Sequence, residues 1–339
     1  MSRIDVPPGM KIAAQVSPEA DDDELQFVRQ MGIDWAVCWT DGAHAGYDYY
    51  ARTRERFEQA GIRIYGFGNR DVHNQDAIVL GLDNRDAKIE EYLEHLRSLG
   101  KAGIPYTTYA HMANGIWSTE REATRGGASA RGFDSARAEA GHWAGKEYYL
   151  PLTHDRAYSQ DEIWENYRYF VAHAAPVAEE AGVRIGIHPD DPPLPVLGGV
   201  PRCIFSSFDG YEEAMRIADS PNVGLCFCIG CWLEGGDLMG QGVEESLRAF
   251  GQRDKLFKIH FRNVDQPLPH FVETFVDDGY FDMYKAMRVL EETGFDGVLI
   301  PDHIPLMAND PRVGTAYTIG YMKALLKRAQ EERKAQVRP

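Results

Sequence analysis

Four side chains that can bind a metal ion stand at or beside the ends of short apolar segments in the second half of this 339-residue sequence. They are His188, Cys228, His260 and Asp302. Two imidazoles, one thiolate and one carboxylate form a plausible ligand set for a divalent transition metal. Singly, each residue has an ordinary structural explanation, such as a hydrogen-bonded histidine, a buried thiol or an aspartate in a turn. Their recurrence on four successive segments favours a metal site.

Two acids follow the first of these histidines in the run HPDDPP, which spans residues 188–193. The prolines restrict the backbone and would hold Asp190 and Asp191 in place. Turn formation alone explains both acids equally well. The functional interpretations are that they orient His188 and that Asp190 contacts substrate.

Further candidates surround this set. Arg262 lies two residues after His260, so on a strand both side chains point the same way. It could bind a substrate carboxylate through two hydrogen bonds, although a surface salt bridge is an equal alternative. His303 could act as a general acid or base. Tyr317 is a second catalytic candidate that packing could also explain, and His111 is a candidate for substrate binding.

The cysteines indicate free thiols. The count of five is odd, and three of them fall within six residues, which is a poor disulfide framework. Cys226 lies two residues before Cys228 and would face the same side of a strand, but one layer deeper, so core packing is the favoured interpretation. Because no second cysteine pair exists elsewhere, a zinc ribbon is excluded.

The net charge of −16 limits the partners. A field of this sign repels nucleic acid and anionic membrane surfaces. It also repels an anionic metabolite, so such a substrate would need a metal or an arginine in its site. The sequence shows no signal peptide and no apolar run long enough to span a membrane. A cytoplasmic protein with a small-molecule substrate is the expectation.

Short apolar segments alternate with amphipathic ones along the chain. Strands are predicted at 11–16, 34–39, 63–67, 105–110, 183–188, 223–228, 256–261 and 297–301. Helices are predicted at 21–31, 47–60, 85–99, 159–181, 211–218, 243–250, 283–293 and 314–329. Eight such units favour a closed (β/α)8 barrel, whose strand ends meet in one cup. An open doubly wound sheet is the alternative, but no glycine-rich phosphate fingerprint follows the first strand.

The pattern predicts a single domain over residues 1–339 with two irregular parts. Residues from about 112 to 158 lack clear periodicity and are predicted to form a long loop after the fourth strand. Loops of this length in compact domains are commonly lids or binding loops. Residues from about 327 to 339 form a charged C-terminal tail.

Several motifs together resemble the mannonate dehydratase family. They are PVAEEAGVR at 176–184, HPDDPP at 188–193, PVLG at 195–198, FCIG at 227–230, HFRN at 260–263, DMY at 282–284 and PDH at 301–303. HPDDPP is highly specific, and the others occur in the family's order and spacing. The resemblance covers residues from about 160 to 325 clearly and the first 110 loosely.

The resemblance implies a xylose-isomerase-like TIM barrel with manganese or ferrous iron held by His188, Cys228, His260 and Asp302. It implies His303 as the catalytic histidine and Tyr317 as the catalytic tyrosine, with Tyr321 as a competitor. It also implies a homodimer. The sequence departs from the family at 304–307, which reads IPLM where a glycine and polar residues are usual, and in its shorter loop after the fourth strand.

The expected reaction is the metal-dependent dehydration of a sugar acid, D-mannonate first, to 2-dehydro-3-deoxy-D-gluconate. One alternative is a metal-dependent sugar isomerase or epimerase on the same barrel, although those enzymes typically bind their metal with more carboxylates. A second alternative is a non-catalytic sugar-acid binding protein. A metal-dependent nuclease is opposed by the acidic charge.

Overall fold

Parallel strands close into a barrel at the centre of the protein. The computed structural model describes residue 4 and residues 6–337 of the chain. The strands of the barrel are β1 (Lys11–Ile12), β2 (Ala14–Gln15), β3 (Trp35–Thr40), β4 (Arg63–Asn69), β5 (Tyr106–Tyr109), β12 (Arg184–Ile187), β15 (Val223–Cys228), β16 (Leu256–Phe261) and β19 (Val298–Pro301). Since β1 pairs with β19 and β2 pairs with β3, these two short pieces act as one first strand, interrupted at Ala13, that closes the barrel. The predicted barrel and its eight strands are confirmed.

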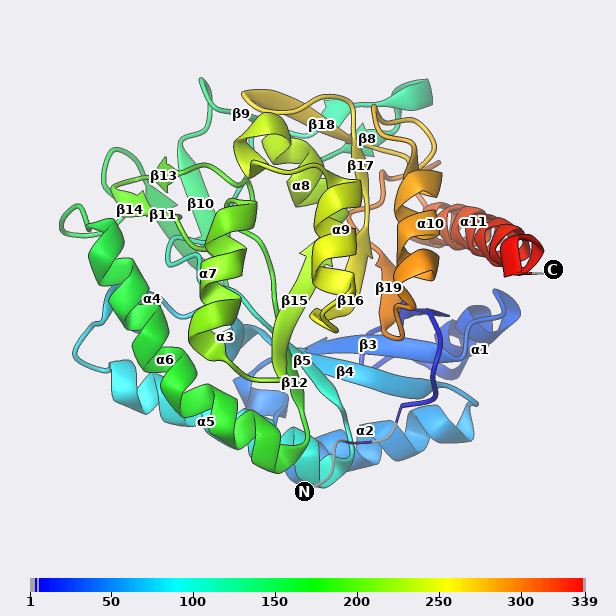
Figure 1. Ribbon diagram of the computed structural model, residues 1–339, viewed down its shortest axis with the longest axis horizontal. Coiled ribbons are helices and arrows are strands. Elements are labelled where there is room, and N and C mark those ends of the chain that lie inside the picture. Colours follow the sequence, from blue (N-terminus) through cyan, green and yellow to red (C-terminus); the bar gives the residue numbers. More distant parts are fainter. Residues whose placement is uncertain (1–3, 5, 338–339) are drawn as a thin grey trace.

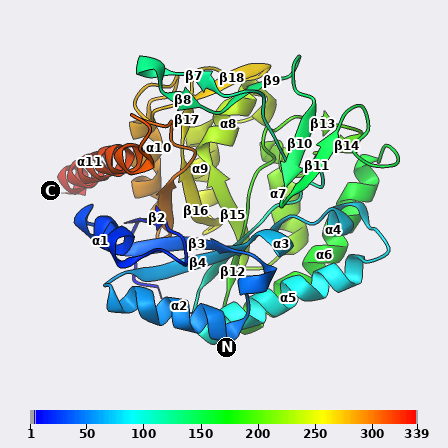
Figure 2. The same ribbon diagram turned by 180° about the vertical axis from the view of Figure 1, so that it is seen from behind.

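Helices surround the barrel, as Figures 1 and 2 show from opposite sides. The longer ones are α1 (Asp22–Gln30), α2 (Tyr47–Gln59), α5 (Arg85–Ala102), α6 (Gln160–Ala181), α7 (Phe208–Ala218), α9 (Val243–Gly251), α10 (Met283–Thr293) and α11 (Pro311–Val337). The shorter ones are η1 (Gly42–His44), α3 (Arg70–His73), α4 (Asp76–Leu80), η2 (Arg125–Gly127), α8 (Ile229–Gly235) and η3 (Gly236–Met239). In the part of the chain that the structure describes, none of these helices has the length and apolar character needed to cross a membrane.

Local sequence signals explain where α6 begins and ends. The Ser159 side chain accepts from the Glu162 backbone N–H while the Glu162 carboxylate accepts from the Ser159 N–H, which is a complete capping box. The helix stops at Gly182, whose φ of 70° is in the left-handed region that glycine adopts without strain.

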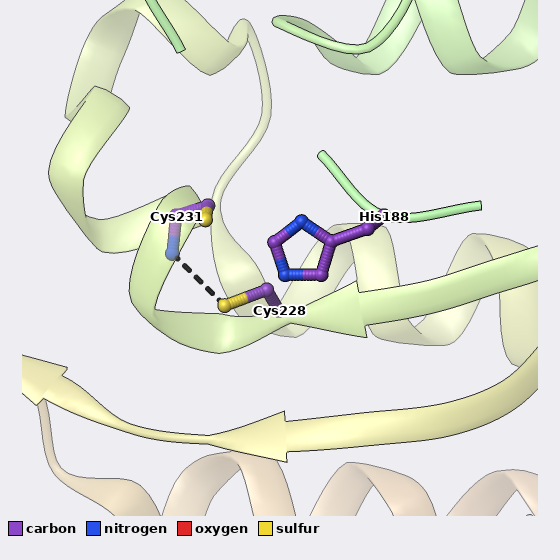
Figure 3. Close-up of side chains that lie close together, drawn as sticks. All are labelled: His188, Cys228 and Cys231. Atoms are coloured by element: carbon purple, nitrogen blue, oxygen red, sulfur yellow. Dashed lines mark hydrogen bonds between the residues drawn. The ribbon is translucent and has the colours of Figure 1, made fainter. Parts of the chain in front are cut away.

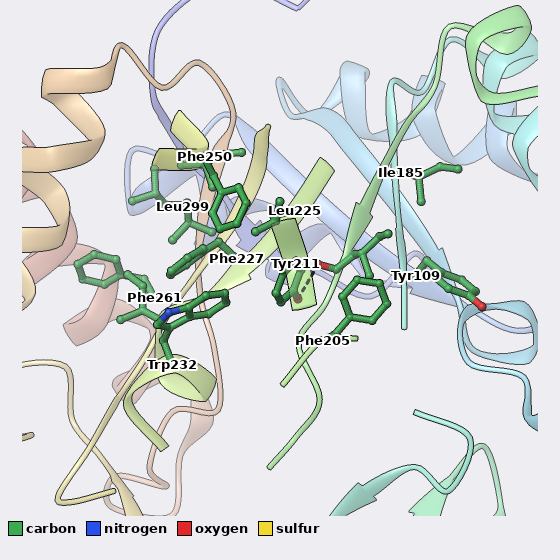
Figure 4. Close-up of a cluster of buried hydrophobic side chains, with 14 of the residues drawn as sticks. Tyr109, Ile185, Phe205, Tyr211, Leu225, Phe227, Trp232, Phe250, Phe261 and Leu299 are labelled. Carbon is green, nitrogen blue, oxygen red and sulfur yellow. Dashed lines mark hydrogen bonds between the residues drawn. The ribbon is translucent and has the colours of Figure 1, made fainter. Parts of the chain in front are cut away.

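The core lies between the strands and this outer ring of helices. Every residue of β15 and β16 is buried, as expected for parallel strands covered on both faces. Phe227 of β15 stacks on Trp232 of α8 with ring centroids 4.1 Å apart, and Tyr211 of α7 packs beside Trp232 (Figure 4). These contacts hold α8 against the end of β15, where Cys228 lies.

The long loop predicted over residues 112–158, after the fourth barrel strand, is an insertion that includes short strands. This insertion contains β6 (Ile116–Trp117), β7 (Glu122–Ala123), β8 (Ser129–Ala130), β9 (Gly132–Asp134), β10 (Ala140–Trp143) and β11 (Lys146–Tyr149). A second group of strands follows later barrel strands: β13 (Val196–Leu197), β14 (Val200–Pro201), β17 (Asn263–Val264) and β18 (His270–Thr274). Because β9 pairs with β18, two distant segments form one layer over the upper rim of the barrel in Figures 1 and 2.

The predicted charged tail is also largely ordered. Helix α11 continues to Val337 instead of stopping near residue 329, and Arg328 and Glu332 of its last part form an ion pair at 2.9 Å. Alternating opposite charges four residues apart support such a helix. The last two residues of the predicted tail lie outside the described part of the chain.

Candidate active site

Four neighbouring barrel strands bring the predicted metal-binding side chains to one point at their carboxyl ends. Ligand atoms of Cys228, His260 and Asp302 all lie within 4.8 Å of one another, and so do those of His188, Cys228 and Cys231. His188 Nε2 lies 3.2 Å from His260 Nδ1, which joins the two groups. Donor atoms that share one ion must lie this close together, so the arrangement fits a single divalent metal.

The two imidazoles present suitable nitrogens. His188 Nδ1 donates to the Pro189 carbonyl at 2.7 Å, which leaves Nε2 to face His260. A metal-binding histidine is usually oriented by a hydrogen bond from the ring nitrogen that does not bind the metal. His260 turns Nδ1 toward Asp302 Oδ2, 3.4 Å away, and Nε2 toward Cys226 Sγ, also 3.4 Å away. Cys226 is fully buried on the inner side of His260, as the predicted core position requires.

Cys228 ends β15 and caps the first turn of α8. Its Sγ accepts from the Cys231 backbone N–H at 3.4 Å, and the His188 ring points toward it (Figure 3). Burial alone would raise the pKa of this thiol, but a hydrogen bond with the Cys231 side chain and the positive charge of Arg262 hold it well below its usual range. A thiolate is the form that binds metal.

The negative charges of the candidate ligands favour a positive charge bound among them. Burial disfavours a charged imidazole, yet the negative charges of Asp302 and Cys226 raise the pKa of His260 well above its usual value. The pKa of Asp302 is held well below its usual range, because His260 and His303 outweigh the effect of burial. A divalent cation would balance these negative charges in place of protons. This is a further reason that the donor set fits a metal.

A cavity of about 470 Å³ opens beside this cluster, and His188, His260 and Asp302 form part of its wall. That volume lies within the range of about 300–1,000 Å³ common for small-molecule sites. Trp39 of β3 and Trp143 of β10 line it as well, so the insertion contributes to the site.

His303 is the candidate acid or base in the cavity wall. Its side chain is 35% exposed, and its Nδ1 lies 2.8 Å from Glu273 Oε1. Its φ of 42° is in the left-handed region, which is uncommon for a residue with a side chain and often marks functional positions. Burial lowers the pKa of His303, but Asp302 and Glu273 outweigh it and raise the value to about 9.

Arg262 does not occupy the substrate-binding position expected for it. It is 1% exposed and does not line the cavity. Its Nε donates to Asp302 at 3.1 Å, one terminal nitrogen donates to Glu273 at 2.8 Å, and the other donates to Cys228 Sγ at 3.2 Å. Because these groups use its donors, Arg262 supports the ligands from behind instead of clamping a substrate carboxylate.

Asp190 and His111 also lie outside the cavity wall. Asp190 is buried with its Oδ1 3.9 Å from Arg202 Nε, and burial raises its pKa to about 7. Its neighbour Asp191 is the acid that reaches the cavity. His111 is buried with its Nδ1 2.8 Å from the Tyr109 hydroxyl. The expected substrate contacts of Asp190 and His111 therefore find no support in their placement.

Tyr317 lies near the cavity but not in its wall. It is 37% exposed, and Arg125 donates to its hydroxyl at 3.4 Å. Pro311 and Thr315, from the first turns of the same helix, do line the cavity. Tyr321, the alternative tyrosine, is partly buried against the core.

Arg70 is a cavity residue that sequence reasoning missed. It begins α3 directly after β4, and its side chain lines the cavity. Within the described part of the chain its guanidinium forms neither a hydrogen bond nor an ion pair, whereas its carbonyl accepts from Trp143 Nε1 at 3.0 Å. The same signal that singled out the metal ligands, a polar residue just beyond a barrel strand, could have found it.

Comparison with known proteins identifies the family. The family model described as D-mannonate dehydratase (UxuA) matches residues 10–145 and 146–336, nearly the whole chain. The chain belongs to the D-mannonate dehydratase family. This family is generally metal-dependent, in agreement with the cluster of donors described above.

Individual members of the D-mannonate dehydratase family are similar to this chain in sequence and structure. The mannonate dehydratase of Enterococcus faecalis is 31% identical over 277 residues, covering 74% of this chain and 75% of the relative. That of Streptococcus agalactiae serotype V is 29% identical over 304 residues, covering 81% and 85%. The crystal structure of mannonate dehydratase from Streptococcus suis serotype2 superposes with a TM-score of 0.84 at 25% identity, covering 98% of this chain and 96% of that one.

Other solved barrels share the fold alone. An L-ribulose 3-epimerase structure matches with a TM-score of 0.64 at 12% identity, covering 97% of this chain and 98% of the other. Because membership of the D-mannonate dehydratase family rests on sequence as well as fold, it separates this chain from such epimerases. The prediction of a hydro-lyase is confirmed, and the alternatives of an isomerase and of a non-catalytic binding protein are set aside.

Proposed function

We propose that this protein dehydrates D-mannonate to 2-dehydro-3-deoxy-D-gluconate and water, with manganese or ferrous iron as its metal. The observation that carries the proposal is the convergence of four metal-binding side chains beside the cavity histidine, in a chain of this family. His188, Cys228, His260 and Asp302 would hold the ion. Bound there, it would stabilise the negative charge that develops on the carboxylate side of the substrate when the C2 proton leaves.

His303 is the proposed acid. It would give a proton from Nε2 to the departing 3-hydroxyl, so that this group leaves as water. The electron pair of the broken C2–H bond forms the C2–C3 double bond, and the resulting enol converts to the 2-keto acid. The Glu273 carboxylate, 2.8 Å from Nδ1, favours the protonated ring needed for this step.

Tyr317 and His303 are the two proposed bases for the C2 proton. With Tyr317 as base, His303 starts protonated; with His303 as base, its ring starts neutral, takes the C2 proton and gives that proton to the 3-hydroxyl. His303 already lines the cavity. Tyr317, the residue implied by the family resemblance, would have to turn inward with the first turns of α11. Pro311 and Thr315 bring that helix to the cavity edge.

Arg70 is proposed to attract the anionic substrate and to contact its carboxylate or a nearby hydroxyl. The net charge of −16 opposes binding of an acid, so a cation in the cavity has a clear use. Arg70 is suited to it because its guanidinium is not engaged by another described residue. This role replaces the one expected of Arg262.

The direct test uses protein loaded anaerobically with manganese and a panel of aldonates that includes D-mannonate. A 2-keto-3-deoxy acid formed from D-mannonate, and lost on chelation, is the expected result. Metal-loaded protein that forms no such product from D-mannonate would contradict the proposed substrate. A homodimer, a cytoplasmic location and action of the chain as one domain are further proposals, which light scattering, fractionation and calorimetry would test.

A further inference from the structure

Glu273 lies behind His303 on strand β18, in the hairpin that follows barrel strand β16. It is 1% exposed. A single oxygen, Oε1, lies 2.8 Å from His303 Nδ1 and also accepts from Arg131 at 2.9 Å and from Arg262 at 2.8 Å. Two buried guanidinium groups therefore hold this carboxylate in place, and neither Glu273 nor the two arginines line the cavity.

These contacts determine which nitrogen of His303 carries the hydrogen toward Glu273. Arginine can only donate, so the shared oxygen of Glu273 acts as an acceptor, and Nδ1 must be the donor. Nε2 is then left for the cavity, whether the ring is neutral or charged. A carboxylate on one imidazole nitrogen is a common way to orient the other toward its reaction partner.

We propose that Glu273 is a positioning residue for the dehydration: it holds the His303 ring with Nε2 toward the substrate. Arg131, which immediately precedes β9 in the insertion, and Arg262, which follows β16, hold the Glu273 carboxylate in turn. Through the contact of Arg131 with Glu273, the insertion thereby helps to orient the catalytic histidine. Arg131 itself does not touch the substrate in this role. The inference rests on the proposed function, because it assumes that His303 transfers protons.

Glu234 provides a matched control. It is fully buried and contacts the same two arginines, Arg131 at 3.3 Å and Arg262 more closely, but it has no hydrogen bond to His303. A general effect of weakening the buried ion pairs should therefore appear in both variants.

The experiment compares Glu273→Gln, Glu273→Asp and Glu234→Gln, each checked for metal content and thermal unfolding. We expect kcat of Glu273→Gln on D-mannonate to fall by about 10- to 100-fold with KM little changed, as is typical when the partner of a functional histidine is removed. Glu273→Asp keeps the charge between the arginines but shortens the reach to His303, so it should fold and still lose kcat. Glu234→Gln should stay close to the parent.

A second readout does not need turnover. In metal-free protein with ¹⁵N-labelled histidine, the His303 signals are assigned by their loss in His303→Asn. The Nδ1 signal should show a hydrogen-bonded N–H in the parent and in Glu234→Gln, and it should change in both Glu273 variants. If Glu273→Asp and Glu234→Gln match the parent in kcat and in this signal, the positioning role is wrong. Absence of turnover in the parent itself would instead contradict the proposed function.

Discussion

His303 and Arg70 owe their proposed roles to a shared position at the ends of barrel strands. Each lines the cavity. Arg70 follows β4 directly, and His303 follows Asp302, the candidate ligand just beyond β19. Arg262, by contrast, points to the same cluster but is surrounded by carboxylates and thiols that use its donors. At the scale of single residues, access to the cavity separates groups that can act on a substrate from groups that support them.

Replacing His303 with asparagine should lower kcat by about 100-fold or more, because a positioned proton donor commonly contributes at least that factor. Metal content should be retained, since Asp302 and the other three candidate ligands are unchanged. Product formation under saturating D-mannonate, with metal analysis in parallel, checks this. His173→Asn, on the exposed face of α6, is the control. Unimpaired turnover in His303→Asn would refute the assignment.

Replacing Arg70 with methionine should raise KM for D-mannonate by about 10-fold and leave kcat nearly unchanged. A charge-assisted contact to the substrate is worth about 1.5–3 kcal/mol, and 1.4 kcal/mol corresponds to a factor of 10. Steady-state kinetics at constant ionic strength measures both constants. Arg52→Met makes the same change in net charge at an exposed site on α2. Equal effects of the two changes would point to the overall charge alone.

At the scale of elements, a buried network joins the insertion to the barrel. Arg131 donates to Glu273 of β18 and to Asp191 of the HPDDPP turn, and Phe133 stacks on Phe271 across the pair β9–β18. The regular strands and helices were predictable, because each carries its own periodicity. This layer was not, because its strands are short and β9 pairs with β18 across more than a hundred residues of sequence.

Replacing Arg131 with methionine should lower the free energy of unfolding by about 3–5 kcal/mol, since it leaves three buried carboxylates to share one buried cation, Arg262, in place of two. Denaturant unfolding measures the loss, and limited proteolysis should locate the first cleavages within residues 112–158. Arg137→Met on the same insertion should leave the free energy of unfolding nearly unchanged, because its ion pairs are exposed. Equal stability of the two variants would contradict the role given to the network.

At the scale of the whole molecule, the metal site and the fold should stabilise each other. The four candidate ligands come from four strands of one barrel, so an ion that binds them favours the closed barrel over the unfolded chain. The same convergence requires that most of the chain be folded before the site exists.

Manganese at about 100 times its dissociation constant should add about 2.7 kcal/mol to the free energy of unfolding. Thermal unfolding with manganese and with chelator should therefore differ by several degrees in the parent. Cys228→Ser should reduce both the bound metal and this difference, because a hydroxyl is a poorer ligand for the metal than a thiolate. Cys203→Ser, away from the candidate ligands, is the control. If the unfolding temperatures with manganese and with chelator differ as much in Cys228→Ser as in the parent, Cys228 is not a ligand.

The sequence by itself determined the barrel, its family and the four candidate ligands, because periodicity, strand-end positions and short motifs are local properties. Only the tertiary structure decided which polar residues face the cavity. Arg262, Asp190 and His111 were plausible in sequence, but the fold surrounds them with protein, while the Glu273–His303 contact comes from its long-range packing. Burial and hydrogen-bond partners depend on segments far apart in the chain, so no local pattern records them.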